Sequence, residues 1–230
     1  MPPYLLLKHV YACLSGEQLV LLDLKADRYF ALECTEAAAL APLVRGWPVQ
    51  ADGSGGGDET MVRELLSRSL LTQDESAGKD AMPVAVDTAE AELFLDDTVP
   101  LLNARRVTTA LVATTRAAVL MRCTALARIV RGVSRRKRLR GGAPAPAVEE
   151  LRELVSVFDY LRPFLFSARD GCLLDCLALS EFLAPHGLFP TWVFGVRTKP
   201  FAAHCWLQHD GVLLNDCIER TGSFTPIMTV

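Results

Sequence analysis

The first 75 residues alternate short apolar runs with turn-forming residues. Ser15-Gly16 and Ala26-Asp27 separate three runs that are rich in aliphatic and aromatic side chains. Runs of this length between turn residues are typical of strands, so we predict a three-stranded meander. The runs are LLLKHVYACL (5–14), QLVLLDLK (18–25) and RYFALE (28–33).

Two helices are expected after this meander. Thr35 is a candidate N-cap for a short helix that ends near Gly46. A glycine-rich loop covers residues 51–59, and apolar side chains then recur at helical spacing through residues 61–73. The order is β-β-β-α-α, and we assign residues 1–75 to one small domain.

The next segment, 76–92, lacks periodicity and is rich in Ala, Asp and Glu, which is typical of a linker. Residues 93–230 are assigned to a second domain. Its first predicted element is a long helix over 99–131. The basic run SRRKRLR and the Gly/Pro stretch after it occupy 134–147. They predict a solvated connector or, alternatively, a docking patch for an acidic partner or phosphates.

Three kinds of element are predicted in the rest of the second domain. The segment EELRELVSVFDYLRPFLF forms an amphipathic helix that Pro163 stops. Another helix begins at Cys172, and TWVFGV (191–196) is a strand. A β-hairpin over residues 200–216 follows, with a turn at Asp210-Gly211.

Composition and charge narrow the class of protein. The 230 residues carry a formal net charge of −3, which gives no general argument for binding nucleic acid. The longest apolar-leaning window, 107–121, contains Arg116 and falls short of the roughly 20 apolar residues that a membrane span needs. Lys8 and His9 interrupt the first apolar stretch, so no signal peptide is expected. We therefore expect the seven cysteines to be reduced thiols in the cytosol.

The segment SARDGCLLDCLALSEFLAPHG carries the first candidate catalytic residue. Asp170 is a good N-cap and places Cys172 in the first turn of a helix. The positive end of the helix dipole and the free amides favour the thiolate there, and the thiolate is the nucleophile. A cysteine at a helix start, with His and Asp on later strands, is the arrangement of papain-like and transglutaminase-like thiol enzymes.

The predicted hairpin places His204 on its first strand and Asp216 at the end of its second. A two-residue loop would point these side chains to opposite faces. A three-residue loop, His209-Asp210-Gly211, with Gly211 in the left-handed conformation, would make them direct neighbours on one face. We predict the second arrangement, because a carboxylate there can orient the imidazole toward a thiol.

Other interpretations of these residues remain open. A histidine beside a tryptophan in a strand is often a satisfied core residue, and an aspartate at a strand end often caps a turn. Asn215 takes the orienting role only if the loop has four residues. A redox pair of Cys172 and Cys176, or a zinc site, fits less well because both usually have C-x2-C spacing. The possible zinc ligands are Cys172, Cys176, His204, Cys205, His209 and Cys217.

Residues 93–230 resemble the B proteins of lasso-peptide biosynthesis, which are leader peptidases of transglutaminase-like fold. The resemblance rests on CLLDCLALSEFL, WVFGVRTKPFAAHCWLQHDGVLLND and FTPIMTV, which occur in order and with compatible spacing. The catalytic Cys, His and Asp of that family fall on Cys172, His204 and Asp216. Cys176 stands where the family usually has Ser, which adds a second thiol near the site.

The first domain is similar to PqqD-like elements, on the segment LVLLDLKADRYFALECTEAAAL. In that family a leader peptide adds as a strand beside the third strand and packs against the last helix. The implied fold class is α+β, with a winged-helix-like PqqD-type domain (a three-stranded sheet plus helices) before a transglutaminase/papain-like cysteine peptidase domain. The implied leader-binding residues are Tyr29, Phe30, Ala31, Leu32, Glu33, Val62, Leu65, Leu66 and Ser69.

Together these resemblances imply a cytosolic cysteine peptidase that captures a precursor peptide and cuts off its leader. Cys172 would attack the scissile carbonyl, His204 would act as base and then acid, and Asp216 would orient His204. No cofactor and no metal is expected. The implied partners are the precursor leader and an ATP-dependent, asparagine-synthetase-like macrolactam cyclase, with no nucleic acid and no membrane. Two alternatives remain, a leader-binding adaptor with an inactive thiol site and a transglutaminase-type acyl transferase.

Overall fold

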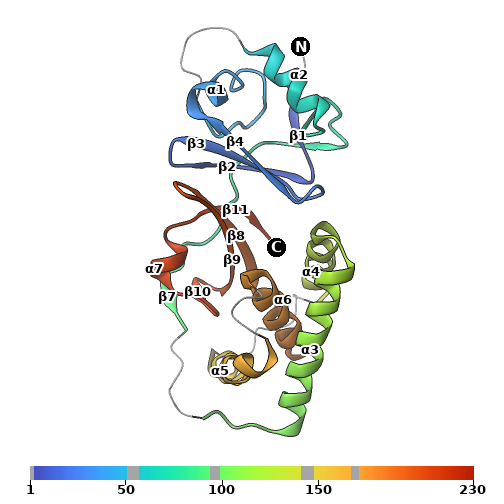
Figure 1. Cartoon of the computed structure of the whole chain (residues 1–230), viewed down its shortest axis with the longest axis vertical. Coiled ribbons are helices and arrows are strands. Elements are labelled where there is room, and N and C mark those ends of the chain that lie inside the picture. The colour runs from blue at the N-terminus through green and yellow to red at the C-terminus, as the bar shows by residue number, and fades with distance from the viewer. Residues whose placement is uncertain (1–2, 51–56, 94–98, 141–147, 167–170) are drawn as a thin grey trace. The chain divides into compact units, whose positions relative to one another are not determined.

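The computed structural model describes residues 3–50, 57–93, 99–140, 148–166 and 171–230 (Figure 1). Its contacts divide the chain into two compact units. The first unit consists of Met1–Ala85, Gly195–Ala203 and Phe224–Met228, and the second of Val86–Phe194, His204–Ser223 and Thr229–Val230. The predicted domains, 1–75 and 93–230, stay predictions. The two compact units differ from the predicted domains, because the segments Gly195–Ala203 and Phe224–Met228 belong to the first unit.

The predicted meander is present in the first unit. β2 (Val10–Ser15), β3 (Gln18–Asp23) and β4 (Arg28–Glu33) pair antiparallel in that order. The first apolar run is split by a turn, so that β1 (Leu5–Leu7) is a separate strand. β3 is buried at five of its six positions, as expected for the central strand of a small sheet.

The first predicted helix is wrong at both ends. It was expected to begin after Thr35 and to end near Gly46, whereas α1 spans Cys34–Ala38. Glu33 is its N-cap, and the Glu36 side chain accepts a hydrogen bond from the Glu33 amide at 3.1 Å. A pair of glutamates therefore caps this helix in place of the threonine.

The second predicted helix, 61–73, is observed two residues earlier as α2 (Glu59–Ser67). Its N-cap is Asp58, whose carboxylate accepts hydrogen bonds from two amides of the first turn. Ser69 has a left-handed φ of 58°, which ends the helix before residue 73. The chain then enters β5 (Leu71–Thr72).

The predicted linker, 76–92, contains two short strands. β6 (Gly78–Lys79) pairs with β1, which lies between β5 and β6 in a second small sheet. At the other end, β7 (Ala91–Glu92) pairs in parallel with β10 (Val212–Leu213). The segment is therefore hydrogen-bonded to a sheet at each end.

The predicted helix over 99–131 is two helices, because Thr124 adopts an extended conformation between them. Pro163 lies inside the following helix and does not stop it. At this position, in the last turn, a proline removes a single intrahelical hydrogen bond. Within the described residues, no helix combines the length and apolar character needed to cross a membrane. The bounds are α3 (Ala104–Cys123), α4 (Leu126–Arg140) and α5 (Val148–Leu165).

The basic run is helical, so the prediction of a connector is wrong for residues 134–140. These residues form the second half of α4, and residues 141–147 lie outside the described ones. The Arg136 guanidinium donates to both carboxylate oxygens of Glu181 on α6 (Gly171–Leu183), at 2.8 and 2.6 Å. Glu181 is buried, and such a charge needs a partner of this kind. The run therefore helps to fix α4 against the interior of the second unit.

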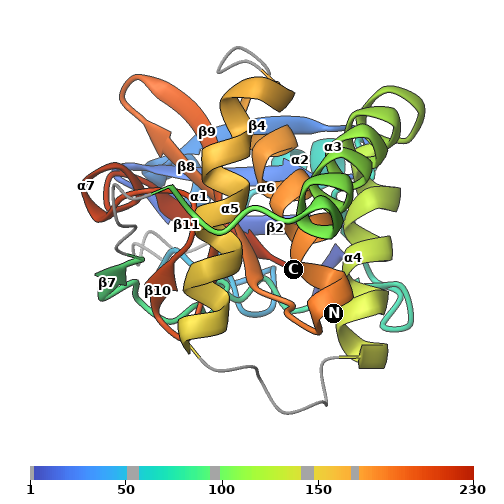
Figure 2. The ribbon, with the colours of Figure 1, turned by 90° about the horizontal axis from the view of Figure 1, so that it is seen from below.

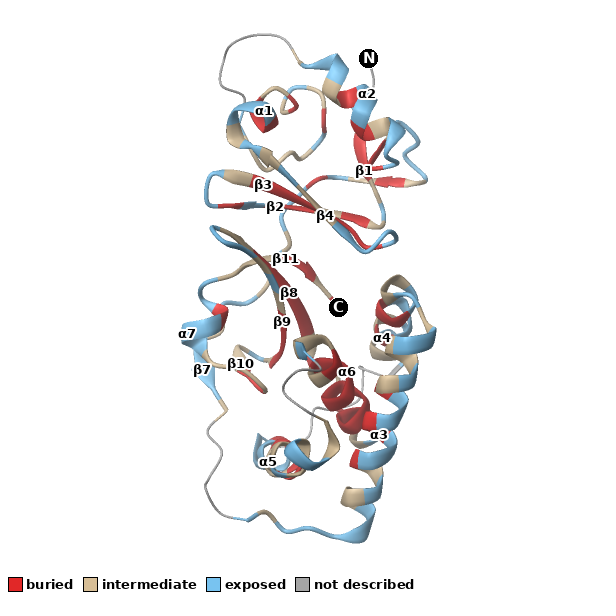
Figure 3. Ribbon diagram, in the orientation of Figure 1, coloured by how far each residue is buried: buried red, intermediate tan, exposed pale blue. Residues whose placement is uncertain are grey.

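Helix α6 (Gly171–Leu183) lies between α3 and α5 (Figure 2). It is buried along most of its length (Figure 3), and a left-handed Gly187 ends the turn that follows it, as predicted. A five-stranded sheet has the order β11-β8-β9-β10-β7. Its remaining strands and the short helix between them are β8 (Thr191–Thr198), β9 (Phe201–His209), α7 (Ile218–Thr221) and β11 (Thr225–Thr229).

Candidate active site

The turn between β9 and β10 contains two residues, not the three that were predicted. Val212 pairs with His209, so only Asp210 and Gly211 lie in the turn. Their φ angles are 48° and 75°, which a type I′ hairpin turn requires. The left-handed Gly211 is confirmed, and the three-residue loop is wrong.

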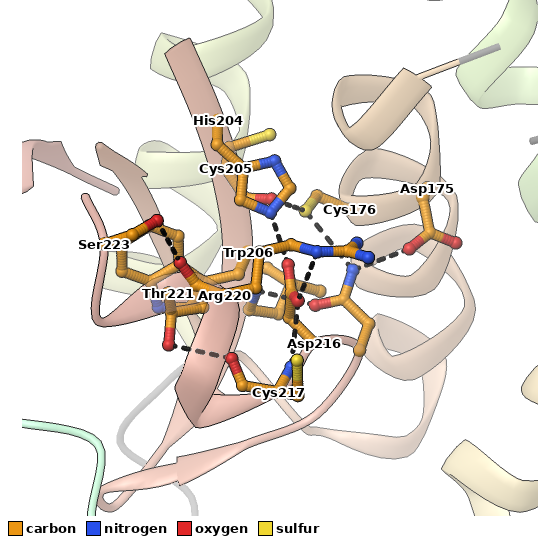
Figure 4. A network of polar contacts seen from close by, with 12 residues as sticks. Asp175, Cys176, His204, Cys205, Trp206, Asp216, Cys217, Arg220, Thr221 and Ser223 are labelled. Carbon is orange, nitrogen blue, oxygen red and sulfur yellow. Dashed lines mark hydrogen bonds and ion pairs between the residues drawn. The ribbon is translucent and has the colours of Figure 1, made fainter. Parts of the chain in front are cut away.

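This register alone would place His204 and Asp216 on opposite faces, yet their side chains are hydrogen-bonded (Figure 4). The reason is that β10 ends at Leu213 and the chain bends through residues 214–216. Side chains alternate only while the strand continues. The bend, and not the strand register, turns the Asp216 carboxylate onto Nε2 of His204.

Cys172 lies in the first turn of α6, as predicted. The helix begins at Gly171, whose φ is 82°, and the predicted N-cap Asp170 lies outside the described residues. The Cys172 thiol is hydrogen-bonded to His204. Because Nε2 of His204 faces Asp216, Nδ1 is the ring nitrogen left for the thiol. The three predicted catalytic residues thus lie together in one unit.

The electrostatics of this trio differ in one respect from the expectation. The hydrogen bond with Asp216, followed by that with Cys172, raises the pKa of His204 to about 9. Burial raises the pKa of Asp216, but its bonds with His204 and the Cys217 amide outweigh burial, so the net pKa is lowered. A hydrogen bond to Cys205 and burial raise the pKa of the Cys172 thiol, against the bond to His204. The resting site therefore holds a thiol beside an imidazolium, and not the predicted thiolate.

The trio lines a cleft of about 470 Å³. The end of α5 contributes Arg162 and Pro163 to this cleft, the residue just after it contributes Phe166, and α6 contributes Asp175. None of these four was among the predicted site residues. The signal for Asp175 is its spacing of three from Cys172, which places both on neighbouring parts of one helix face. Nothing in the sequence connects the end of α5 with the site.

A cysteine at a helix start, facing a His–Asp pair on a hairpin, occurs in several thiol enzymes. Residues 100–229, more than half of the chain, match the transglutaminase-like superfamily. The chain belongs to this superfamily. No curated protein and no solved structure matches it. This match and the observed mixture of helices and sheets confirm the α+β class and the transglutaminase-like character of the second part. Cysteine peptidases and acyltransferases are common in the superfamily.

Further thiols surround the site of the transglutaminase-like domain. Cys176 is buried one turn after Cys172, and its Sγ lies 3.4 Å from the Cys205 carbonyl oxygen. Cys217, half-buried, is the N-cap of α7. In the part of the chain that the structure describes, no group of three or more His, Cys, Asp or Glu side chains is placed to hold a metal ion. The six side chains considered as zinc ligands therefore do not form such a group.

The residues expected to bind a leader peptide lie in the first unit. Five of them belong to β4, which is one of the two edge strands of its sheet; they are Tyr29, Phe30, Ala31, Leu32 and Glu33. The other four lie on or just after α2, and they differ in exposure. Val62 and Leu65 are buried in the core, whereas Leu66 and Ser69 keep some exposure.

Proposed function

We propose that this protein is a cysteine peptidase that removes the leader from a ribosomally made precursor peptide. The single observation that carries the proposal is the hydrogen-bonded chain from Cys172 through His204 to Asp216. It lies in a cleft of a transglutaminase-like domain, a superfamily in which thiol peptidases are common. The leader as substrate comes from the resemblance to lasso-peptide B proteins.

The reaction proceeds in two steps on the Cys172 sulfur. The imidazolium of His204 first releases a proton to solvent, which frees Nδ1 to act as the base. Sγ then attacks the carbonyl carbon of the scissile bond while the thiol proton passes to Nδ1 of His204. The C–N bond breaks as His204 returns this proton to the leaving amine, and a thioester remains. Water, giving a proton to His204, then hydrolyses the thioester and restores the thiol. Asp216 holds the imidazole in the required orientation throughout.

The oxyanion formed in each step needs a hydrogen-bond donor. The amide of Cys172 stands at the start of α6, where amides have no carbonyl of their own helix to bond. We assign it as one donor, because it lies on the residue that carries the nucleophile and at the positive end of the helix.

The first unit supplies leader recognition in this proposal. β4 is an edge strand of its three-stranded sheet, and an extended peptide can add to such an edge as a further strand. The partly exposed Leu66 near the end of α2 and the exposed Ser69 just after it offer a second contact, whereas the buried Val62 and Leu65 hold the helix in place. The freed core peptide passes to an ATP-dependent macrolactam cyclase, as the resemblance implies.

A cleavage assay tests this function. The protein is incubated with a candidate precursor peptide, with and without the cyclase and ATP, and the products are read by mass spectrometry. A cut at the leader–core junction is expected, and Cys172→Ala should abolish it. Cys123→Ala is the matched control, because Cys123 is exposed at the end of α3 and does not line the cleft.

The same assay separates the alternatives. Binding of the precursor without any cut, with cyclase and ATP present, would favour a leader-binding adaptor. A product in which an added primary amine replaces the free acid would favour an acyl transferase, which uses the same trio of residues. Deleting residues 1–75 should weaken leader binding in a titration, and unchanged binding would remove the recognition role of the first unit.

A further inference from the structure

The Asn215 side chain lies where three parts of the site meet. Its carbonyl oxygen accepts a hydrogen bond from the Leu207 amide on β9, at 2.9 Å. Its amide nitrogen donates to the Asp175 carboxylate on α6, at 2.7 Å. The Asn215 side chain, which directly precedes Asp216, therefore joins the strand that carries His204 to the helix that carries Cys172.

The bond to Leu207 takes the place of a strand pairing. The last backbone bond of the hairpin runs from the Leu214 amide to the Leu207 carbonyl, at 2.9 Å. Beyond it the chain bends away, and the Leu207 amide would lack a partner if Asn215 did not supply one. Because Asn215 and Asp216 are adjacent, fixing the first side chain also fixes the backbone from which the second projects.

Asp175 holds the other side of this connection. Its side chain is 13 % exposed, and Nη1 of Arg162 lies 3.6 Å from the oxygen that Asn215 also contacts. The second carboxylate oxygen is buried without a hydrogen-bond partner among the described residues. Burial raises the pKa of Asp175, and the bonds from Asn215 and Arg162 oppose this. A carboxylate in this position is costly unless those donors hold it.

We propose that Asp175 and Asn215 form a positioning pair that sets the Asp216–His204 dyad against the Cys172 thiol. Asn215 fixes the bend before Asp216, and Asp175 ties that bend to the nucleophile helix. The inference rests on the proposed function, because it concerns the same site. In this role the pair acts through Asp216 and His204 and exchanges no proton with the substrate.

An exchange of the two side chains tests the pair. Asn215→Asp alone keeps the acceptor for Leu207 but sets two carboxylates against each other. The bend should then move, Asp216 should leave His204, and the pKa of His204 should fall by at least about 1 pH unit. In the double variant Asp175→Asn/Asn215→Asp, donor and acceptor are reversed and the bond returns. The pKa of His204 should return to within about 0.3 pH unit of its original value.

The measurement is an NMR titration of the imidazole signal of His204 in each variant. Asp159→Asn is the matched control, because Asp159 contacts Arg162 at 3.0 Å and makes no described contact with Asn215. It should leave the pKa of His204 unchanged.

Two results would overturn the pairing: an unchanged pKa in Asn215→Asp, or a double variant that is unfolded or keeps the low pKa. The readout is a titration and not cleavage. A protein that cleaves no precursor would therefore contradict the proposed function without contradicting the positioning of His204 by this pair.

Discussion

Replacing Asp216 with asparagine should return the His204 imidazole toward its ordinary titration. The hydrogen bond between these side chains is the largest of the contributions that raise the pKa of His204 from 6.5 to about 9. That difference of about 2.5 pH units corresponds to about 3 kcal/mol in favour of the imidazolium. Asparagine keeps the shape of the side chain and removes its charge. We therefore expect the pKa to fall by about 1 to 2 pH units, which is about 1.5 to 3 kcal/mol.

The assay is an NMR titration of the histidine ring protons between pH 5 and 10. The chain has four histidines, and His204→Gln identifies the signal in question. Asp210→Asn is the matched control, because its carboxylate lies 3.6 Å from His209 and takes no part in the trio. Cys172→Ala should lower the pKa of His204 by less than Asp216→Asn does, since the bond to Cys172 is the second contribution.

The same pairing also makes stability depend on pH, with a sign that can be checked. The pKa of His204 is higher in the folded than in the unfolded chain, so its contribution to the free energy of unfolding is complete below pH 6.5. It is lost as the pH rises through about 9, and Asp216→Asn should show a smaller loss that is complete at a lower pH. An NMR titration midpoint of His204 near pH 6.5 in the wild type, or a midpoint that Asp216→Asn leaves unchanged, would refute the reasoning.

Three further predictions concern reactivity and stability. Alkylation of Cys172 by iodoacetamide, followed by peptide mass spectrometry, should accelerate as the pH rises toward about 9; rapid alkylation already at low pH would instead indicate a preformed thiolate. Gly211→Ala should lower the free energy of unfolding by about 1 kcal/mol, because φ is 75° at this position. Gly132→Ala should raise the free energy of unfolding by about 0.5 to 1 kcal/mol, because this glycine lies inside α4 and an added Cβ would meet no atom within 4 Å. Urea unfolding measures both changes, and changes of the same sign would contradict this expectation. Glu181→Ala should cost about 3 to 5 kcal/mol in the same assay, because it strands the Arg136 charge, and a further Arg136→Met should recover part of that loss.

Local signals in the sequence were sufficient for several elements of both units. Alternating apolar runs between turn residues predicted β2, β3 and β4, because each strand is bounded by its own turn. The start of α6 near Cys172 and the end of the following turn at Gly187 were likewise encoded within a few residues. The conjunction of a helix-start cysteine with a His and an Asp on later elements was enough to select the trio.

Other features depend on contacts that no local pattern contains. The bend after Leu213 is held by the Asn215 side chain, so the contact between His204 and Asp216 was predicted from a wrong turn length. The basic run was taken for a connector because its partner, Glu181, lies far along the chain. The raised pKa of Cys172 comes from Cys205 and from burial, which a helix-dipole argument does not include.

The burial of α6 means that the two halves of the site differ in local stability. The helix that carries Cys172 is packed on most sides, so its amides should exchange with solvent only when the whole unit opens. Asp216 stands on a short bend held by side-chain hydrogen bonds, and such a segment opens at a lower free energy. On heating, hydrogen exchange should therefore rise first around residues 214–216. The site would then lose the Asp216 carboxylate while Cys172 is still held in place.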